Sequence, residues 1–157
     1  MIDRSIITGP IEEDNIAQHG IDLNVTKISR VCGSPGIIPR KGKTTLPQYA
    51  TEEVQSGIWH LEEGIYDLVF AQGCKIPADR MMLIKHRSSV LRSGAIVDSG
   101  IFDAGFETEN LGAFLIVHHP IQIEYFARVA QAVAFESKEV ENLYDGQWQR
   151  DNQRNNS

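Results

Sequence analysis

The sequence predicts an all-β protein whose body is a distorted, jelly-roll-like β-barrel with one or two short helical turns. Its 157 residues include 13 glycines and 6 prolines, which divide the chain into segments of strand length. Several of these segments alternate apolar and polar residues, as half-buried strands do. No window of about a dozen residues carries the apolar stripe of an amphipathic helix. Many short strands separated by turns are typical of a barrel or a sandwich.

Six segments have the length and composition of strands. They are 21–28, 65–70, 81–85, 111–117, 121–125 and 129–135. The segment 121–125 alternates cleanly, whereas 111–117 is nearly all apolar and is expected to be buried on both faces. Short helical turns are expected at 88–93 and at 139–144.

The stretch 33–55 departs from the strand pattern and is expected to be a long surface insertion. It contains three prolines and the basic cluster 40–43. Residues 36–44 resemble the phosphate loop G-x-x-x-x-G-K-[ST], but five residues separate the two glycines and Pro39 lies between them. No helix N-terminus follows to present backbone amides. The composition therefore favours a mobile loop over a nucleotide-binding one.

The chain length suits one domain, since about 150 residues can bury roughly 70% of their extended surface. We expect this domain to span 1–149, with 33–55 as its surface loop. The remaining residues, 150–157, are all polar and are expected to form a flexible tail.

Charge and composition limit the partners that the protein can have. The net charge of −6 opposes binding to a nucleic acid polymer, which depends on basic surface, although arginines in a cleft can still bind a small polyanion. No apolar stretch approaches the ~20 residues of a membrane-spanning helix, so no membrane partner is expected. The start of the chain lacks a secretory signal, and its two cysteines, Cys32 and Cys74, lie far apart. A reducing, cytoplasmic location is expected.

The run 86–107 concentrates the residues that could carry chemistry. Two arginines and four serines, which suit phosphate oxygens, precede Asp103 and the aromatic Phe106. A carboxylate on a tight connection could hold and deprotonate a water molecule, although a turn aspartate often only bonds its own backbone. Likewise, any one arginine could be a solvated surface residue. Together these residues indicate a nucleotide site.

The run also resembles a known family. Arg-Ser-Ser-x-x-Arg-x-Gly followed by Gly-Ile-Phe-Asp-Ala-Gly-Phe is similar to the central motifs of the superfamily that contains dUTP pyrophosphatases and dCTP deaminases. The outer segments 18–23, 128–135 and 144–149 follow the same order of motifs. The likeness extends from Ile16 to Gln149 but leaves out 33–55. It implies the β-clip fold of dUTPases.

The resemblance implies a role for each motif. Asp103 would orient the nucleophilic water, and Phe106 would pack on the deoxyribose and exclude a 2′-hydroxyl. The residues expected to contact the phosphates are Arg87, Ser88, Ser89, Arg92 and Gln131. The uracil would be bound mainly by the backbone of Ser99, Gly100, Ile101 and Phe102. The terminal segment would contribute contacts from Tyr144, Gln147 and Gln149.

The same residues help to separate hydrolysis from deamination. Deaminases of the superfamily carry a glutamate ten residues after the motif aspartate, where this chain has Ala113. A zinc mechanism would need H-x-E with P-C-x-x-C, which does not occur. The expected reaction is therefore hydrolysis of dUTP to dUMP and pyrophosphate, with Mg²⁺ bound through the substrate phosphates and no metal site on the protein. This reaction would control dUTP and supply dUMP.

Two alternatives stay open at this stage. One is a dCTP deaminase, or a bifunctional deaminase and dUTPase, that uses a displaced carboxylate such as Glu107 or Glu109. The other is a regulatory member of the superfamily that binds a nucleotide without turnover. The resemblance further implies a homotrimer, with Asp103 and Phe106 on one chain and the arginines on its neighbour. The adjacent His118 and His119 are expected at a strand end and not at a metal, because neighbouring strand residues point to opposite faces.

Overall fold

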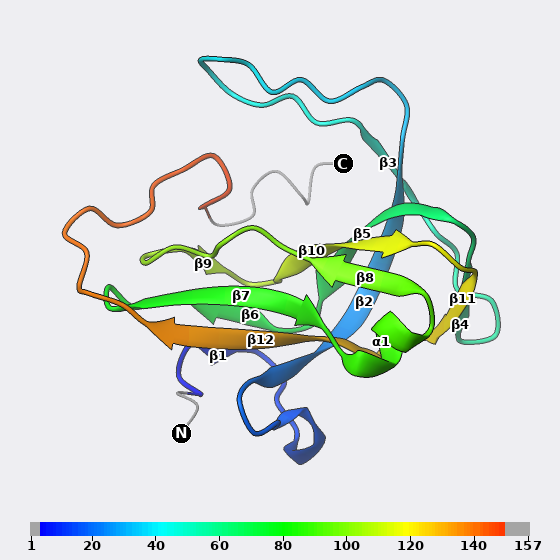
Figure 1. Cartoon of the computed structure of the whole chain (residues 1–157), viewed down its shortest axis with the longest axis horizontal. Coiled ribbons are helices and arrows are strands. Elements are labelled where there is room, and N and C mark those ends of the chain that lie inside the picture. Colours follow the sequence, from blue (N-terminus) through cyan, green and yellow to red (C-terminus); the bar gives the residue numbers. More distant parts are fainter. Residues whose placement is uncertain (1–3, 150–157) are drawn as a thin grey trace.

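Strands are the main regular structure in the part of the chain that the structure describes, as the sequence predicts. The computed structural model describes residues 4–149 (Figure 1), and the expected tail 150–157 lies outside this range. The elements are β1 (Ile7–Thr8), the 3-10 helix η1 (Glu13–Asn15), β2 (Ile21–Cys32), β3 (Gln48–Thr51), β4 (Ile58–Leu61), β5 (Gly64–Phe70), β6 (Gly73–Lys75), β7 (Arg80–His86), α1 (Ser88–Arg92), β8 (Ala95–Asp98), β9 (Glu107–Thr108), β10 (Gly112–Val117), β11 (Ile121–Glu124) and β12 (Arg128–Glu136).

One antiparallel sheet organises the fold. Its strand order is β7-β12-β2-β5-β10-β8, and β3 pairs with the second half of β2. The first half of β2 pairs with β12 and the second half with β5. The register shifts on β2 between Val25 and Lys27, where the strand passes from one partner to the other. A bulge of this kind bends and twists a strand, which curls the sheet toward closure.

The two ends of this sheet meet and nearly close it into a barrel. Met82 on β7 and Phe102, just after β8, exchange two backbone hydrogen bonds of 3.0 and 2.9 Å. Beside them, the Nζ atom of Lys85 lies 2.9 Å from a carboxylate oxygen of Asp98. Closure leaves few unpaired strand edges and fixes the segment that follows β8 against β7. The predicted distorted β-barrel is therefore confirmed.

The core lies inside this curled sheet and consists of the inward residues of each strand. On β10, Ala113, Leu115 and Val117 are buried, whereas Gly112, Phe114 and Ile116 are only half-buried. The prediction that 111–117 is buried on both faces was therefore wrong. The outer face of this strand is covered by loops that leave a pocket, and not by a second packed layer.

The stretch 33–55 is more ordered than a mobile loop. Its second part forms β3, and Ile37 and Thr45 exchange backbone hydrogen bonds of 2.8 and 3.0 Å. Residues 33–47 thus make a long excursion that stands off the body between β2 and β3 (Figure 1). Ile37 and Ile38 are largely exposed on it.

The two predicted helical turns have different outcomes. Helix α1 confirms the turn expected at 88–93. The turn expected at 139–144 was wrong, because that segment is irregular. Its backbone bonds the body instead: the Val140 amide donates to the Ala78 carbonyl at 3.0 Å and the Tyr144 amide to the Ala104 carbonyl at 2.8 Å. These tertiary bonds attach the segment to the body.

Gly73, on the short strand β6, shows how closely the small sheet β1-β6-β9 packs. A Cβ atom added there would lie 2.3 Å from the Thr108 carbonyl oxygen and 2.5 Å from that of Glu109. We expect Gly73→Ala to lower the free energy of unfolding by about 2 kcal/mol or more, because backbone atoms must move. Urea unfolding followed by tryptophan fluorescence measures this change. Gly36→Ala is the control, since its nearest contact is a side-chain atom at 3.1 Å, and equal losses in both variants would contradict the prediction.

The described residues contain no helix that is both long enough and apolar enough to cross a bilayer.

Candidate active site

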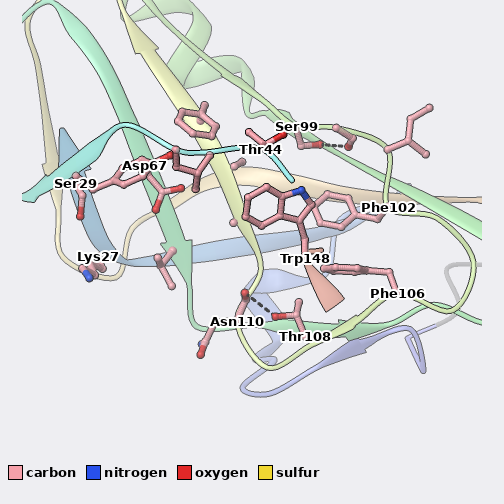
Figure 2. A pocket seen from close by; sticks show the side chains of 18 of the residues that line it. Lys27, Ser29, Thr44, Asp67, Ser99, Phe102, Phe106, Thr108, Asn110 and Trp148 are labelled. Atoms are coloured by element: carbon pink, nitrogen blue, oxygen red, sulfur yellow. Dashed lines mark hydrogen bonds between the residues drawn. The ribbon is translucent and has the colours of Figure 1, made fainter. Parts of the chain in front are cut away.

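A pocket of about 620 Å³ lies on the outer face of the main sheet (Figure 2). Its floor comes from β2, β5 and β10, one wall from the segment 99–106, and its cover from residues of the 33–47 excursion and of the C-terminal segment. We call residues 144–149 the C-terminal strap. Of the predicted site residues, the pocket is lined by Ser99, Gly100, Ile101, Phe102, Asp103, Phe106 and Tyr144.

Asp103 lies on a tight turn at the edge of this pocket. The Phe106 amide donates to the Asp103 carbonyl at 3.1 Å, and the Gly105 amide donates to the Ile76 carbonyl at 2.9 Å. Gly105 has a φ of 86°, a left-handed conformation that favours glycine. The Asp103 side chain is exposed and is therefore available to water and ligand. The sequence Asp-Ala-Gly-Phe thus forms a turn that presents an exposed carboxylate to the pocket.

The wall beside Asp103 is fixed by bonds to β7. The Ser99 hydroxyl accepts a hydrogen bond from the Ile84 amide at 3.0 Å, and Phe102 pairs with Met82. Between these anchors, Gly100 and Ile101 line the pocket and are exposed. This segment therefore offers backbone groups to a ligand from a rigid support.

The carboxylate of Asp98, next to this wall, is stabilised in its ionised form. The hydrogen bond from Lys85, followed by that from the Ser99 amide, lowers the pKa of Asp98 below its ordinary value. Asp98 thus stays ionised at neutral pH and keeps its bonds to both partners.

Aromatic rings gather at the same end of the pocket. The ring centroids of Phe102 and Phe106 are 5.4 Å apart, and the Phe106 and Tyr144 rings meet edge to face, also at 5.4 Å. The Trp148 indole lines the same pocket (Figure 2). Trp148 was not among the predicted site residues. Its neighbours in the strap, Gln147 and Gln149, were predicted to contact the substrate. An aromatic residue between two predicted contacts was the signal that could have identified Trp148.

The strap is held over the pocket by hydrogen bonds between its two glutamine side chains and backbone groups of the same chain. Gln149 accepts from the Glu107 amide at 3.0 Å and donates to the Gly105 carbonyl at 2.9 Å. Gln147 accepts from the Thr44 amide at 3.2 Å and donates to the Thr44 carbonyl at 3.1 Å. The two glutamines thus tie the strap to the Asp103 turn and to the 33–47 excursion.

The remaining predicted residues form a separate group, which we call the arginine cluster: Arg87, Ser88, Ser89, Arg92 and Gln131. None of them lines the pocket. Ser88, Ser89 and Arg92 are exposed on α1. Arg87 and Gln131 both bond Asp22, at 3.0 Å each. Within one chain, the structure therefore brings the predicted nucleoside residues together and leaves the predicted phosphate residues apart.

The carboxylates near Ala113 differ from those that the sequence suggested. Ala113 does line the pocket, whereas Glu107 and Glu109 do not. Asp67 on β5 lines it instead, with Lys27 on β2. Sequence counting from Asp103 could not find Asp67, because it comes from a different strand. Its only sequence signal is the alternation that places it on the outer face of β5.

No three histidine, cysteine, aspartate or glutamate side chains among residues 4–149 form a group that could hold a metal ion. His118 and His119 directly follow β10, as expected, and both are exposed.

The fold and the site match one family. A family model described as dCTP deaminase-like matches residues 1–137, and the chain belongs to this family. Among curated proteins, it is similar to the deoxyuridine 5′-triphosphate nucleotidohydrolase of Methanocaldococcus jannaschii, with 36% identity over 139 residues that cover 87% of this chain and 88% of that protein. A probable enzyme of the same name from Halobacterium salinarum is 33% identical over 147 residues, covering 90% and 87%.

A solved structure supports the fold. The 2′-deoxycytidine 5′-triphosphate deaminase from Agrobacterium tumefaciens superimposes with a TM-score of 0.61 and 17% identity, covering 82% of this chain and 42% of that one. The family model and the curated relatives confirm the predicted membership of the superfamily.

Proposed function

We propose that the protein is a dUTP diphosphatase, which hydrolyses dUTP to dUMP and pyrophosphate. The observation that carries this proposal is the exposed carboxylate of Asp103 on a glycine turn, at the edge of a pocket with aromatic and backbone walls. The relatives from Methanocaldococcus jannaschii and Halobacterium salinarum support it. Their names describe nucleotidohydrolases of deoxyuridine 5′-triphosphate, and the similarity covers 88% and 87% of their lengths. Ala113 supports hydrolysis over deamination, because a methyl group cannot transfer a proton.

The pocket residues can be assigned to parts of the nucleoside. The backbone of 99–102 would bind the uracil, since Ser99 and Phe102 anchor it on β7. Phe106 would pack on the deoxyribose, where a ring leaves no partner for a 2′-hydroxyl. Trp148 would cover the base from the strap side.

Hydrolysis needs a nucleophile, a base and stabilisation of charge on the leaving group. Asp103 would orient a water molecule and accept its proton as the oxygen attacks the α-phosphorus. The bond from the α-phosphorus to the bridging oxygen breaks, and pyrophosphate leaves with the electron pair. Arginine side chains, together with Mg²⁺ carried by the substrate phosphates, would neutralise the charge that develops on pyrophosphate.

A second copy of the chain would complete the site. Among residues 4–149, the pocket is lined by Asp103 and Asp67 but by only one cationic side chain, Lys27, and is poorly suited to a triphosphate by itself. The arginine cluster lies elsewhere on the same chain, so a neighbour could supply it. A homotrimer, in which each site takes Asp103 from one chain and Arg87 from the next, would supply these cations. We infer a cytoplasmic location, where cysteines outside disulfides, such as Cys32 and Cys74, stay reduced.

The test is incubation of the protein with each deoxynucleoside triphosphate and Mg²⁺, with pyrophosphate and ammonia assayed separately. We expect pyrophosphate from dUTP and no ammonia from dCTP. Ammonia from dCTP would establish the deaminase alternative. Tight nucleotide binding without either product would indicate a regulatory protein.

Trp148 offers a second, narrower test. We expect Trp148→Ala to raise KM for dUTP about tenfold or more, because stacking of a base on an aromatic ring contributes roughly 1–3 kcal/mol. Initial rates at varied dUTP measure KM and kcat. Trp148→Phe is the control and should keep most of the affinity. Equal KM values in the wild type and the alanine variant would remove Trp148 from the site.

A further inference from the structure

A buried carboxylate lies beneath two members of the arginine cluster. Asp22 Oδ2 is 3.0 Å from Arg87 Nε, and Asp22 Oδ1 accepts a hydrogen bond of 3.0 Å from Gln131 Nε2. A third group, Arg128 Nη1, lies 3.7 Å from Oδ2. The Asp22 side chain is only 5% exposed, whereas that of Arg87 is 35% exposed. Asp22 is therefore a buried anion whose cationic partners, Arg87 and Arg128, reach the surface.

The backbone places these groups together. Asp22 and Gln131 are direct cross-strand partners on β2 and β12, and Arg87 follows β7, the other neighbour of β12. Gly20, at the start of this pairing, has no space for a side chain, since an added Cβ atom would lie 2.4 Å from the Ala132 carbonyl oxygen. The segment Gly-Ile-Asp thus brings a carboxylate close against β12. Burial makes this carboxylate costly unless it stays paired.

The bonds to Asp22 decide which atoms of its partners remain for a ligand. Arg87 directs Nε to Asp22, and Nη1 to the Arg128 carbonyl at 3.2 Å. These two bonds fix the orientation of the guanidinium and use two of its five N–H groups. Gln131 uses one of the two hydrogens on Nε2 for Asp22. A planar guanidinium held at Nε and Nη1 can bind a phosphate oxygen with its other N–H groups at little loss of conformational freedom.

We propose that Asp22 is a positioning residue that holds Arg87 and Gln131 in the orientation that binds the substrate phosphates. This inference rests on the proposed function, since it gives those two residues a triphosphate to bind. Asp22 itself touches no substrate atom. Its effect on substrate binding passes through Arg87 and Gln131.

The test is a double-mutant cycle in the full chain. Asp22→Asn keeps the shape but turns one oxygen into a donor that faces other donors. We expect this change to raise KM for dUTP, and Kd for a non-hydrolysable dUTP analogue, about tenfold, with kcat changed less than about twofold. In an Arg87→Ala background the same change should raise Kd by a clearly smaller factor than in the wild-type background, because one of the two groups through which Asp22 acts is gone.

The control is Asp79→Asn, which breaks an ion pair of 2.6 Å with Arg80 at the opposite end of β7 and should leave KM unchanged. Unchanged KM and Kd in Asp22→Asn, or an equal rise in both backgrounds, would overturn the inference. If Asp22→Asn does not fold, Arg87→Lys replaces it. Lysine keeps the charge but has no planar fork, so the same tenfold rise is expected and its absence would overturn the inference.

The analogue separates this inference from the proposed function. A wild-type protein that binds the analogue but releases no pyrophosphate from dUTP would refute the proposed function. The role of Asp22 would still be testable through the Kd of the analogue. A wild-type protein that turns over dUTP, with Asp22→Asn showing the same KM, would end only the inference. A wild-type protein that binds no analogue would end both.

Discussion

Replacing Asp103 by asparagine is expected to reduce pyrophosphate release from dUTP by about 10²- to 10⁴-fold, the usual contribution of a general base. Asparagine can still bond a water molecule but cannot accept its proton. The side chain is exposed on its turn, so the substitution removes no buried contact and the fold should persist. Release of pyrophosphate under single-turnover conditions measures the loss.

Binding provides the internal check on this variant. A non-hydrolysable dUTP analogue should bind Asp103→Asn within a few-fold of the wild-type affinity, because the aromatic and backbone walls of the pocket are intact. Glu109→Gln is the matched control: it removes an exposed carboxylate that does not line the pocket and should leave turnover unchanged. Retained turnover in Asp103→Asn, or a comparable loss in Glu109→Gln, would refute the assignment of the base.

Mixing two inactive variants is expected to restore activity. Asp103→Asn lacks the base and Arg87→Ala lacks a phosphate ligand, so each pure protein should be nearly inactive. If neighbouring chains share each site, random mixed trimers contain one intact combination in about a quarter of their sites. Unfolding and refolding an equimolar mixture, followed by the pyrophosphate assay, should recover that fraction of wild-type activity.

The control for this experiment places both defects on one chain. A mixture of Asp103→Asn with the Asp103→Asn, Arg87→Ala double variant has no intact base and should stay inactive. Size-exclusion chromatography with light scattering should give three times the chain mass for every protein. A monomeric wild type, or a mixture without recovered activity, would place both groups in one chain.

Most of the fold could be predicted because alternation of apolar residues is a local signal. The segment 121–125 alternates and forms β11, and 81–85 lies within β7. β3 was missed because Gln-Tyr-Ala-Thr is short and mostly exposed, and it becomes a strand only by pairing with β2. The helical turn expected at 139–144 failed for a related reason. Backbone bonds to Ala78 and Ala104 are tertiary, and no local pattern reports them.

The site could be predicted only where its residues are contiguous. The run from Ser99 to Phe106 forms one wall of the pocket, as the motif suggested. Asp67 and Trp148 reach the same pocket from other parts of the chain, so their place depends on the curl of the sheet and on the path of the strap. The distance between this wall and the arginine cluster is also a property of the fold.

The pairing of Gln147 with Thr44 has a consequence for how the chain can vary. Gln147 bonds the amide and the carbonyl of residue 44, which are both backbone groups. Almost any amino acid other than proline could provide those two atoms at position 44. The sequence of the 33–47 excursion can therefore change while its bonds to the strap over the pocket are kept. Gln147 has few substitutes, because its side chain must both donate and accept a hydrogen bond.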